Sequence, residues 1–337
     1  MIRRMILLLF IVLIGPITAS DQQWAELGAF KLESGATIQD CRIGYRTFGT
    51  LNGNKSNAVL FPTWFGGISE HLGNLVGPDK LVDSTRFYII AIDALGNGIS
   101  SSPSNSTQQS NISFPKFNIC DMVNSQYRTL TEILEIDHLY AIIGGSMGGM
   151  QTFQWIVSYP DFMDKAVSYV GAPWQTGYGR LVWEAEMLAI ESGLENKVPL
   201  ATITEQVALI QIMNAYTPEY RNRKTLPAEV AVFRQEYIQR FTKNFQIYDW
   251  AAQLRAMMAH DITKILNGDR TITAQKVKAE TFILVSQQDH LVSPGPALEF
   301  AELLGAQTLV FDNDCGHLAP GCEMERFVKA VHKFLNN

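Results

Sequence analysis

The feature that most limits the fold of this chain is a series of short apolar runs rich in β-branched residues, each bounded by turn residues. The clearest runs are Asn57–Phe61, Phe87–Ile92, Leu139–Ile143, Ala166–Val170, Thr281–Val285 and Thr308–Phe311. Stretches with helical periodicity lie between or after them, at Cys120–Leu134, Met147–Tyr159, Pro296–Leu304 and Glu323–Leu335. Continuous apolar runs are typical of strands in a parallel sheet that helices cover on both faces. The alternation therefore predicts an α/β fold with a doubly wound, mostly parallel sheet.

One long segment, residues 174–267, departs from this alternation. It shows helical periodicity without a convincing strand, and Pro199, Pro218 and Pro227 divide it into helices of ordinary length. We interpret it as a helical cap inserted between core strands and lying over the functional site. The alternative is a set of extra helices on the outer face of the sheet. The core is then residues 21–173 and 268–337.

Composition excludes several classes of protein. Of the 337 residues, 47% are hydrophobic and 18% are charged, with 27 Lys and Arg against 33 Asp and Glu. A disordered chain has few large apolar residues and a high net charge, so this chain should fold around a large core. A net charge of −6 and the lack of a long basic run argue against nucleic-acid binding.

The N-terminus resembles a cleavable export signal. Arg3 and Arg4 precede the apolar run Met5–Ile14, and small residues follow up to Ser20. Ten helical residues rise only about 15 Å, half of a bilayer core, so a spanning anchor is the weaker alternative. We expect residues 1–20 to be removed, no stable membrane insertion afterwards, and an exported protein that is periplasmic or secreted.

The four cysteines are Cys41, Cys120, Cys315 and Cys322. Their spacing is not that of a zinc site, and no other His, Cys or carboxylate cluster has ligand spacing, so neither a metal nor a cofactor is expected. Cys315 and Cys322 are close enough in sequence to form a disulfide in an oxidising compartment, and two free buried thiols are the equal alternative.

A glycine-rich turn carries the strongest functional signal. The apolar run ending at Ile143 continues into Gly144–Gly149, which contains Ser146 in a G-x-S-x-G pattern, and a helical stretch follows. This strand, turn and helix context is the one in which a serine nucleophile is held exposed on a strained turn. The helix that begins at Met147 directs its N–H groups to the place where an oxyanion would form.

A serine nucleophile needs a base. In folds with this strand–turn–helix motif, a carboxylate and then a histidine are expected later in the chain. Asp289 follows the run Thr281–Val285, and His317 follows the run Thr308–Phe311. His317 is expected to accept the proton of Ser146, and Asp289 to orient the imidazole.

Other ionisable residues lie near this pair. Asp312 and Asp314 are rival acids, although they precede the histidine too closely to orient it from another strand. His290 is interpreted as a surface histidine.

The second oxyanion donor is expected in the segment Pro62–Gly67, after the first apolar run. The backbone N–H groups of Phe65 and Met147 are the candidate pair. Trp64 and Gly66 are expected beside the substrate, because Gly66 allows close backbone approach. The alternative for these glycines is an ordinary turn.

The chain resembles the homoserine O-acetyltransferase family of the α/β-hydrolase superfamily. The matching stretches cover nearly all of residues 21–337 and are Leu32–Gly35, Tyr45–Asn52, Asn57–Leu60, Asp121–Val123 and above all Ile143–Gln151. The resemblance implies an α/β-hydrolase fold, an acyl-enzyme on Ser146 and a triad completed by Asp289 and His317. Family members pass an acyl group from a coenzyme A thioester to a hydroxyl acceptor, and some dimerise through the cap, so a homodimer is an option here.

The chain departs from the family pattern where the acceptor binds. The family has an Arg that pairs with the amino-acid carboxylate where this chain has Met187, and an Asp after the catalytic histidine where this chain has Leu318. A zwitterionic acceptor needs both charges, because an unpaired buried charge costs several kcal/mol. Arg180 is the candidate for a substitute cation, although a solvated or structural Arg at the edge of the cap is the favoured interpretation.

Three functions are compatible with these residues. The first is an exported serine esterase that acts on small acyl esters, with no cofactor. The second is a homoserine O-acetyltransferase with acetyl-coenzyme A as co-substrate. The third is a ligand-binding protein without activity, which an intact set of Ser146, Asp289 and His317 argues against.

Overall fold

The computed structural model describes residues 20–242 and 245–337. The predicted export signal, residues 1–20, lies outside the described residues except for Ser20. No helix within the described ranges is both long and apolar enough to cross a membrane.

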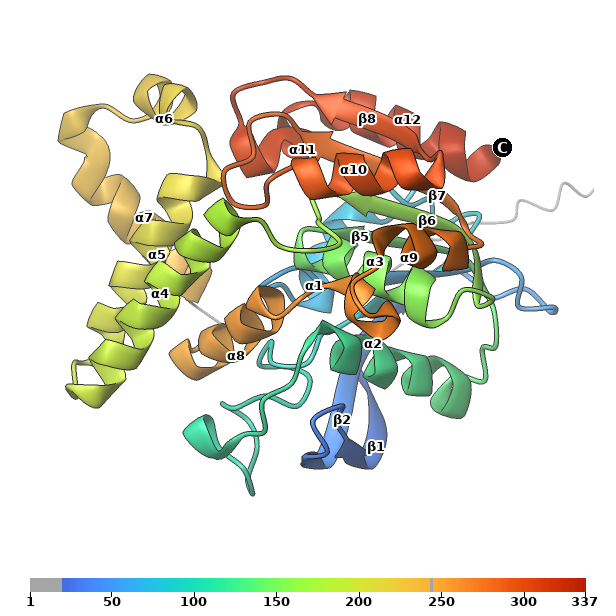
Figure 1. The fold of residues 1–337 in the computed structure, drawn as a ribbon, viewed down its shortest axis with the longest axis horizontal. Coiled ribbons are helices and arrows are strands. Elements are labelled where there is room, and N and C mark those ends of the chain that lie inside the picture. The colour runs from blue at the N-terminus through green and yellow to red at the C-terminus, as the bar shows by residue number, and fades with distance from the viewer. Residues whose placement is uncertain (1–19, 243–244) are drawn as a thin grey trace, which may run out of the picture.

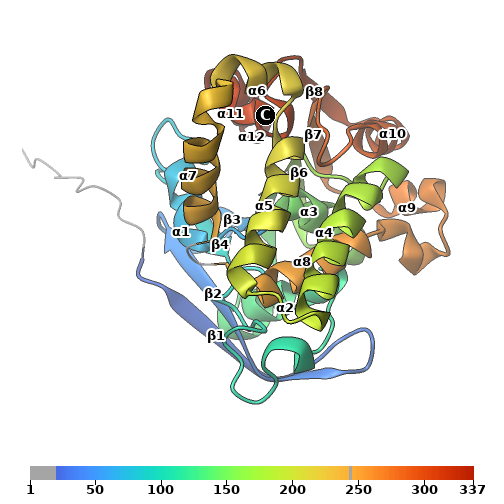
Figure 2. The same cartoon turned by 90° about the vertical axis from the view of Figure 1, so that its left-hand side faces the viewer.

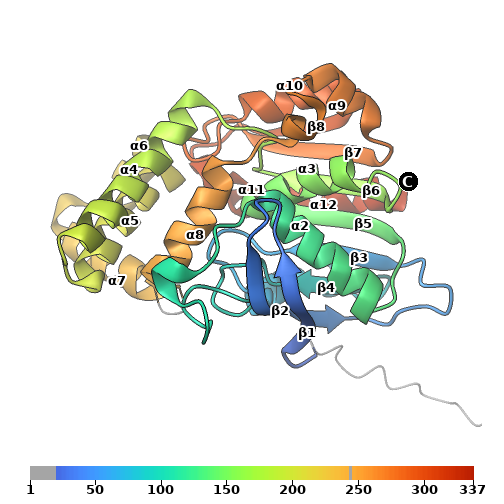
Figure 3. The same cartoon turned by 60° about the horizontal axis from the view of Figure 1, so that its bottom comes forward.

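The core is an eight-stranded sheet in the order β1-β2-β4-β3-β5-β6-β7-β8. The strands are β1 (Gln23–Lys31), β2 (Thr37–Phe48), β3 (Ala58–Pro62), β4 (Tyr88–Ile92), β5 (Leu139–Gly145), β6 (Met163–Tyr169), β7 (Glu280–Ser286) and β8 (Gln307–Phe311). Strands β3 to β8 are parallel, and β2 is antiparallel to both β1 and β4. Figure 3 shows this arrangement, with β1 and β2 at one edge. The predicted mostly parallel sheet and its six predicted strands are confirmed.

The antiparallel strands β1 and β2 are not among the clearest predicted runs. In β1, Ala25 and Leu27 are buried while Trp24 and Glu26 are exposed. One face of this strand meets solvent, so its apolar residues alternate with polar ones instead of forming a continuous run.

Helices cover both faces of the sheet (Figure 1). They are α1 (Ser69–Leu72), α2 (Ile119–Arg128), α3 (Met147–Ser158), α9 (Arg270–Lys276), α10 (Gly295–Leu304), α11 (Ala319–Cys322) and α12 (Met324–Asn336). Phe153 of α3 packs against Phe300 of α10 in one core cluster. Phe327 and Phe334 of α12 belong to a second cluster on the opposite face. The sheet is therefore buried on both sides, as its continuous apolar strands require.

A group of helices lies between β6 and β7 in the chain: α4 (Gly177–Glu195), α5 (Leu200–Ala215), α6 (Pro218–Lys224), α7 (Val230–Thr242) and α8 (Ile247–Met258). They stand to one side of the sheet, and Figure 2 shows α4, α5 and α7 in front of the strands. We call α4–α8 the cap. The chain leaves the core at Pro173 and returns at Ile262, whose N–H donates to Pro173 O at 3.0 Å. The two ends of the inserted segment therefore lie side by side, and its expected bounds, 174–267, stay a prediction.

Candidate active site

Ser146 lies on a sharp turn between β5 and α3. Its backbone has φ 55° and ψ −121°, a conformation that a residue with a side chain adopts only under strain. The flanking glycines make this turn sterically possible. A Cβ at Gly144 would lie 2.1 Å from Gly148 O, and a Cβ at Gly148 would lie 2.6 Å from Pro62 O. The glycines thus let the first turn of α3 pack directly on β5 and β3.

Ser146, His317 and Asp289 are hydrogen-bonded in series. His317 Nε2 lies 2.9 Å from Ser146 Oγ, and His317 Nδ1 lies 2.6 Å from Asp289 Oδ2. Because a carboxylate only accepts, the imidazole Nδ1–H donates to Asp289 and Nε2 is left to accept from the serine hydroxyl. His317 and Asp289 are buried, and Ser146 is half-buried. This is the geometry that a histidine base needs to activate a serine.

Asp289 is held in place from its other side. Its Oδ1 accepts from the N–H groups of Leu291 and Val292, at 2.9 and 2.8 Å. With one oxygen on the backbone and the other on the imidazole, the carboxylate has a fixed orientation. It therefore selects the histidine tautomer whose Nε2 faces Ser146.

The rival acids lie elsewhere. Asp314 forms an ion pair with Arg223 of α6, and Asp312 is exposed. The pairing with Arg223 holds the pKa of the Asp314 carboxyl below its usual range. His290 is exposed, as expected for a surface histidine, and its ring lies 6.4 Å from that of Tyr178.

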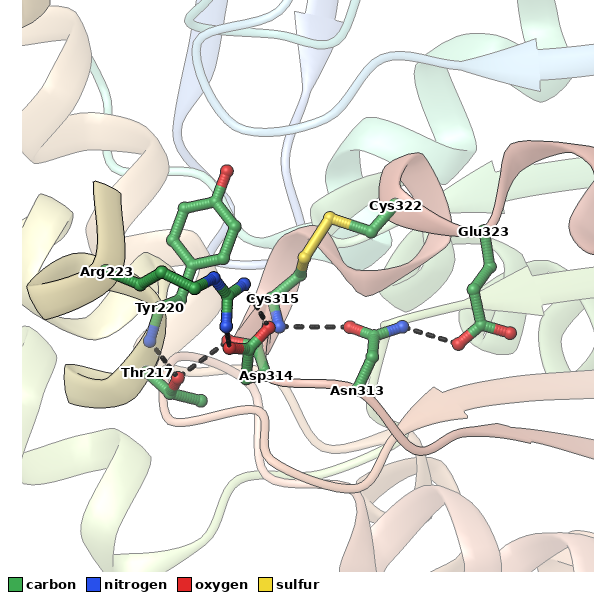
Figure 4. The surroundings of a disulfide bond; sticks show 8 residues. All are labelled: Thr217, Tyr220, Arg223, Asn313, Asp314, Cys315, Cys322 and Glu323. Carbon is green, nitrogen blue, oxygen red and sulfur yellow. Dashed lines mark hydrogen bonds and ion pairs between the residues drawn. A yellow bond between two sulfur atoms is a disulfide. The ribbon is translucent and has the colours of Figure 1, made fainter.

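A disulfide closes the loop that carries His317 (Figure 4). Cys315 and Cys322 are bonded, with a sequence separation of 7. Cys315 N–H donates to Asn313 Oδ1 at 3.0 Å, and Asn313 in turn donates to Glu323. Of the two alternatives for these cysteines, the structure contains the bridge. It connects the residues before His317 to the end of α11.

The cap holds the same loop from the other side. Thr217 Oγ1, buried at the start of α6, donates to Asp314 O at 2.6 Å (Figure 4). Gly316 has φ +61°, and a Cβ there would lie 2.9 Å from Ala215 O at the end of α5. The histidine loop is thus in direct contact with the junction between α5 and α6.

The segment Pro62–Gly67 forms a turn beside Ser146. Gly67 N–H donates to Trp64 O at 2.9 Å, and Gly66, the third residue of the turn, has φ +64°. A turn with a positive φ at this position favours glycine. Within the described residues, the N–H groups of Phe65 and Met147 have no acceptor in the protein. Both backbone donors are therefore available to a bound oxygen atom.

The remaining predicted site residues fall into two groups. We call Trp64–Gly67 the oxyanion turn, after its expected role. Trp64, its first residue, is half-buried and its ring stacks on that of His71, while Leu318 is exposed next to His317. For Arg180 and Met187 the assignment to the substrate site stays a prediction. They line a groove of about 600 Å³ between α4 and α8 that none of the three residues in the hydrogen-bonded series lines.

The surroundings of Arg180 fit the alternative of a solvated or structural Arg. Its Nε donates to Glu184 Oε1 at 2.8 Å, one turn along α4, on an exposed face of the helix. Its charge is thus already paired at the surface.

Two cap residues near the oxyanion turn are absent from the sequence-based predictions. Gln253 of α8 is fully buried and accepts from Gly66 N–H at 2.9 Å. Glu186 of α4 is fully buried and accepts from Trp250 Nε1 at 2.9 Å, and burial raises the pKa of its carboxyl to about 8. An acid on the apolar face of an amphipathic helix is a signal that could have identified Glu186. No local pattern marks Gln253.

No group of three or more His, Cys, Asp or Glu side chains in the described part of the chain is arranged to hold a metal ion.

This fold, with a serine, a histidine and an aspartate hydrogen-bonded in series, defines the class of serine hydrolases and acyltransferases. Residues 58–320 match the family model described as alpha/beta hydrolase fold, and the chain belongs to this family.

Similar proteins include both hydrolases and acyltransferases. A probable esterase of Corynebacterium glutamicum is 29% identical over 92% of this chain and 93% of its own length. An ethyl acetate hydrolase of Pseudomonas veronii is 27% identical over 82% of this chain and 83% of its own. A homoserine O-acetyltransferase of Methanosalsum zhilinae is 28% identical over 91% of this chain and 71% of its own.

Among solved structures, an acetylester hydrolase from Corynebacterium glutamicum superposes with a TM-score of 0.85. The two chains are 26% identical, and the match covers 94% of this chain and 95% of the other. The acyl-transfer class therefore rests on both sequence and fold.

Proposed function

We propose that this protein is an exported esterase that hydrolyses small acyl esters through an acyl-enzyme on Ser146. The observation that carries the proposal is the 2.9 Å contact between Ser146 Oγ and His317 Nε2, backed by Asp289. A serine in such a contact is an activated nucleophile.

The reaction follows from these positions. Ser146 Oγ attacks the ester carbonyl while its proton passes to His317 Nε2, and the carbonyl oxygen becomes an oxyanion facing the N–H groups of Phe65 and Met147. The intermediate collapses, and the alcohol leaves with the proton from His317. Water then attacks the acyl-enzyme, giving its proton to His317. Collapse of the second intermediate returns the proton to Ser146 and releases the carboxylic acid.

Water is the proposed acceptor because the charged groups for an amino-acid acceptor are missing. Leu318 stands where the family has an acid, and Arg180, the candidate cation, is paired with Glu184. A zwitterionic acceptor would leave its charges unpaired here. The similarity to an ethyl acetate hydrolase and to an acetylester hydrolase supports short acyl chains.

Export is the second part of the proposal. Its support is the basic and apolar leader at residues 1–20, together with a disulfide of the kind that persists in oxidising compartments.

Transfer of an acetyl group from acetyl-coenzyme A to homoserine is the second candidate. It is favoured by the 28% identity to a homoserine O-acetyltransferase over 91% of this chain.

Two assays of the purified protein separate the candidates. One offers p-nitrophenyl acetate, and the other offers acetyl-coenzyme A with homoserine. We expect ester hydrolysis that Ser146→Ala abolishes and Asp289→Asn reduces by about 10³–10⁴-fold. Asp312→Asn, which changes an exposed acid near His317, is the control and should hydrolyse the ester at the wild-type rate. Efficient formation of acetyl-homoserine would establish the transferase instead. No turnover in either assay, with no labelling of Ser146 by a fluorophosphonate, would support ligand binding.

A further inference from the structure

Gln253 connects the cap to the turn that carries an oxyanion donor. Its side chain is fully buried; Oε1 accepts from Gly66 N–H at 2.9 Å, and Nε2 donates to Leu95 O at 3.0 Å. Both hydrogen-bonding ends of the amide are thus in contact with the core. The side chain bridges the turn after β3 and the loop after β4.

The bridge acts on a part of the turn that lies beyond its anchored start. The start of the turn is held by Thr63, whose N–H donates to Ile92 O at 3.1 Å and whose carbonyl accepts from Gln151 at 3.0 Å. The peptide between Phe65 and Gly66 lies beyond this anchor, and its N–H is the one that Gln253 holds. Fixing that peptide plane restricts the neighbouring residue, Phe65, whose own N–H is the expected oxyanion donor.

A second contact from the same helix supports the side chain of Phe65. The ring of Trp250 meets that of Phe65 edge to face, with centroids 5.5 Å apart, and Trp250 Nε1 donates to the buried Glu186. Helix α8 therefore contacts the backbone of the oxyanion turn through Gln253 and the aromatic ring of Phe65 through Trp250.

We propose that Gln253 is a positioning residue of the oxyanion hole, so that the cap helix α8 completes the catalytic geometry of the core. This inference rests on the proposed ester chemistry. Hydrogen-bond donors stabilise an oxyanion only when they stand about 2.7–3.1 Å from it, and they act on the transition state more than on the bound substrate. Loss of the bridge should therefore lower kcat while KM changes little.

The test is hydrolysis of p-nitrophenyl acetate by Gln253→Leu, a change that removes both hydrogen bonds at similar volume. We expect kcat to fall about 10- to 100-fold, with KM within about threefold of wild type. Inhibition by an alkylboronic acid, which forms a tetrahedral adduct on the serine, should weaken in parallel with the loss in kcat/KM. Gln253→Glu keeps an acceptor for Gly66 N–H and should recover part of the rate.

Ser104→Ala is the matched control. Ser104 Oγ donates to Asp249 Oδ2 at 2.6 Å, so this change also removes a hydrogen bond between α8 and a core loop, but one without contact to the oxyanion turn. The control should keep the wild-type kcat. All rates are measured well below the melting midpoint of each variant, so that unfolding does not contribute.

The outcomes separate this inference from the proposed function. Both proposals are supported if wild type and Ser104→Ala are active, Ser146→Ala is inactive, and Gln253→Leu has a lower kcat with an unchanged KM. The positioning role would be overturned, and the esterase retained, if folded Gln253→Leu had the kcat of Ser104→Ala or if only its KM changed. An inactive wild type would reject the esterase itself.

Discussion

Gly148 shows how closely the residues of the elbow are fitted to their neighbours. Its Cα faces Pro62 O at the end of β3, and the first turn of α3, with the N–H of Met147, depends on that approach. A methyl group on Gly148 has no room, because it would lie 2.6 Å from Pro62 O, a backbone atom that cannot rotate away.

We predict that Gly148→Ala lowers the free energy of unfolding by about 1–3 kcal/mol and also lowers kcat, since relief of the overlap shifts the N-terminus of α3. Urea unfolding and ester hydrolysis measure the two effects. Gly177→Ala, in a helix position where an added Cβ meets nothing within 4 Å, is the control and should leave both quantities near wild type. A Gly148→Ala enzyme as stable and active as Gly177→Ala would show that the elbow tolerates the methyl group.

A second residue-scale prediction concerns Glu186. Burial raises the pKa of its carboxyl from 4.5 to about 8, so the folded protein holds a proton there that the unfolded chain releases above about pH 4.5. The associated stability is fully present below the unfolded pKa and is lost as pH rises through about 8. Between about pH 4.5 and pH 8 the wild type should therefore lose stability that Glu186→Gln, with no proton to release, retains.

The measurement is the melting midpoint of both proteins across that pH range. The difference, Glu186→Gln minus wild type, should grow as pH rises. Glu184→Gln, on the same helix but partly exposed, should show no such trend. A constant difference would mean that Glu186 is ionised throughout.

At the scale of elements, the loop between β8 and α12 depends on contacts from two directions. The Cys315–Cys322 bridge closes it, and the start of α6 binds it through Thr217. His317 lies between these contacts, so each should affect both stability and activity.

Reduction of the disulfide should lower the free energy of unfolding by about 2–3 kcal/mol, as loop-closure entropy predicts for so short a loop. Urea unfolding with and without a phosphine reductant measures the loss. The double variant Cys315→Ala/Cys322→Ala should unfold at lower urea and respond to no reductant. If the reductant lowers the stability of both proteins equally, the effect lies outside the bridge.

Thr217→Val should reduce kcat several-fold and lower stability by about 1–2 kcal/mol. It removes the hydrogen bond to Asp314 O and also the helix cap, since Thr217 Oγ1 accepts from Tyr220 N–H at 3.1 Å. Asp269→Ala also removes a helix cap, from α9, which does not hold the histidine loop. It should lose comparable stability and keep kcat. Equal rates for the two variants would exclude a role of α6 in placing His317.

At the scale of the whole molecule, the leader and the disulfide lead to one expected outcome. When the full chain is produced in a bacterial host, we expect the periplasm or medium to contain a protein without about the first 20 residues. Intact mass gives the cleavage point, and the mass under non-reducing conditions shows whether Cys315 and Cys322 are joined. Full-length protein in the membrane fraction would instead indicate an uncleaved anchor.

Local pattern was sufficient for most of the sheet and for the residues of the hydrogen-bonded series. Strands such as β5 and β7 are buried on both faces and therefore read as continuous apolar runs, and Ser146, Asp289 and His317 each follow such a run. Parallel strands present their carboxyl ends at one edge of a sheet, so residues far apart in sequence could be expected to meet there. Strands β1 and β2 were harder to recognise, because strands with one exposed face alternate apolar and polar residues and contain no continuous apolar run.

Placement within the cap could not be derived in this way. Periodicity predicts that residues 174–267 are helical, but it contains no information on which helix faces the core, because that depends on surfaces brought together from distant segments. Arg180 was therefore expected at the site although it pairs with Glu184 at the surface. Gln253, one polar residue in an amphipathic helix, was not expected there at all.

The amino-acid order alone therefore determines the class of fold, the nucleophile and its histidine base, because these depend on local periodicity and on strand order, and it favours Asp289 over its rivals as the acid. Only the tertiary structure decides that Cys315 pairs with Cys322, that Asp289 rather than Asp314 contacts His317, and that the cap holds both the histidine loop and the oxyanion turn. These features are distances between segments far apart in the chain. They are fixed by packing, which no local pattern specifies.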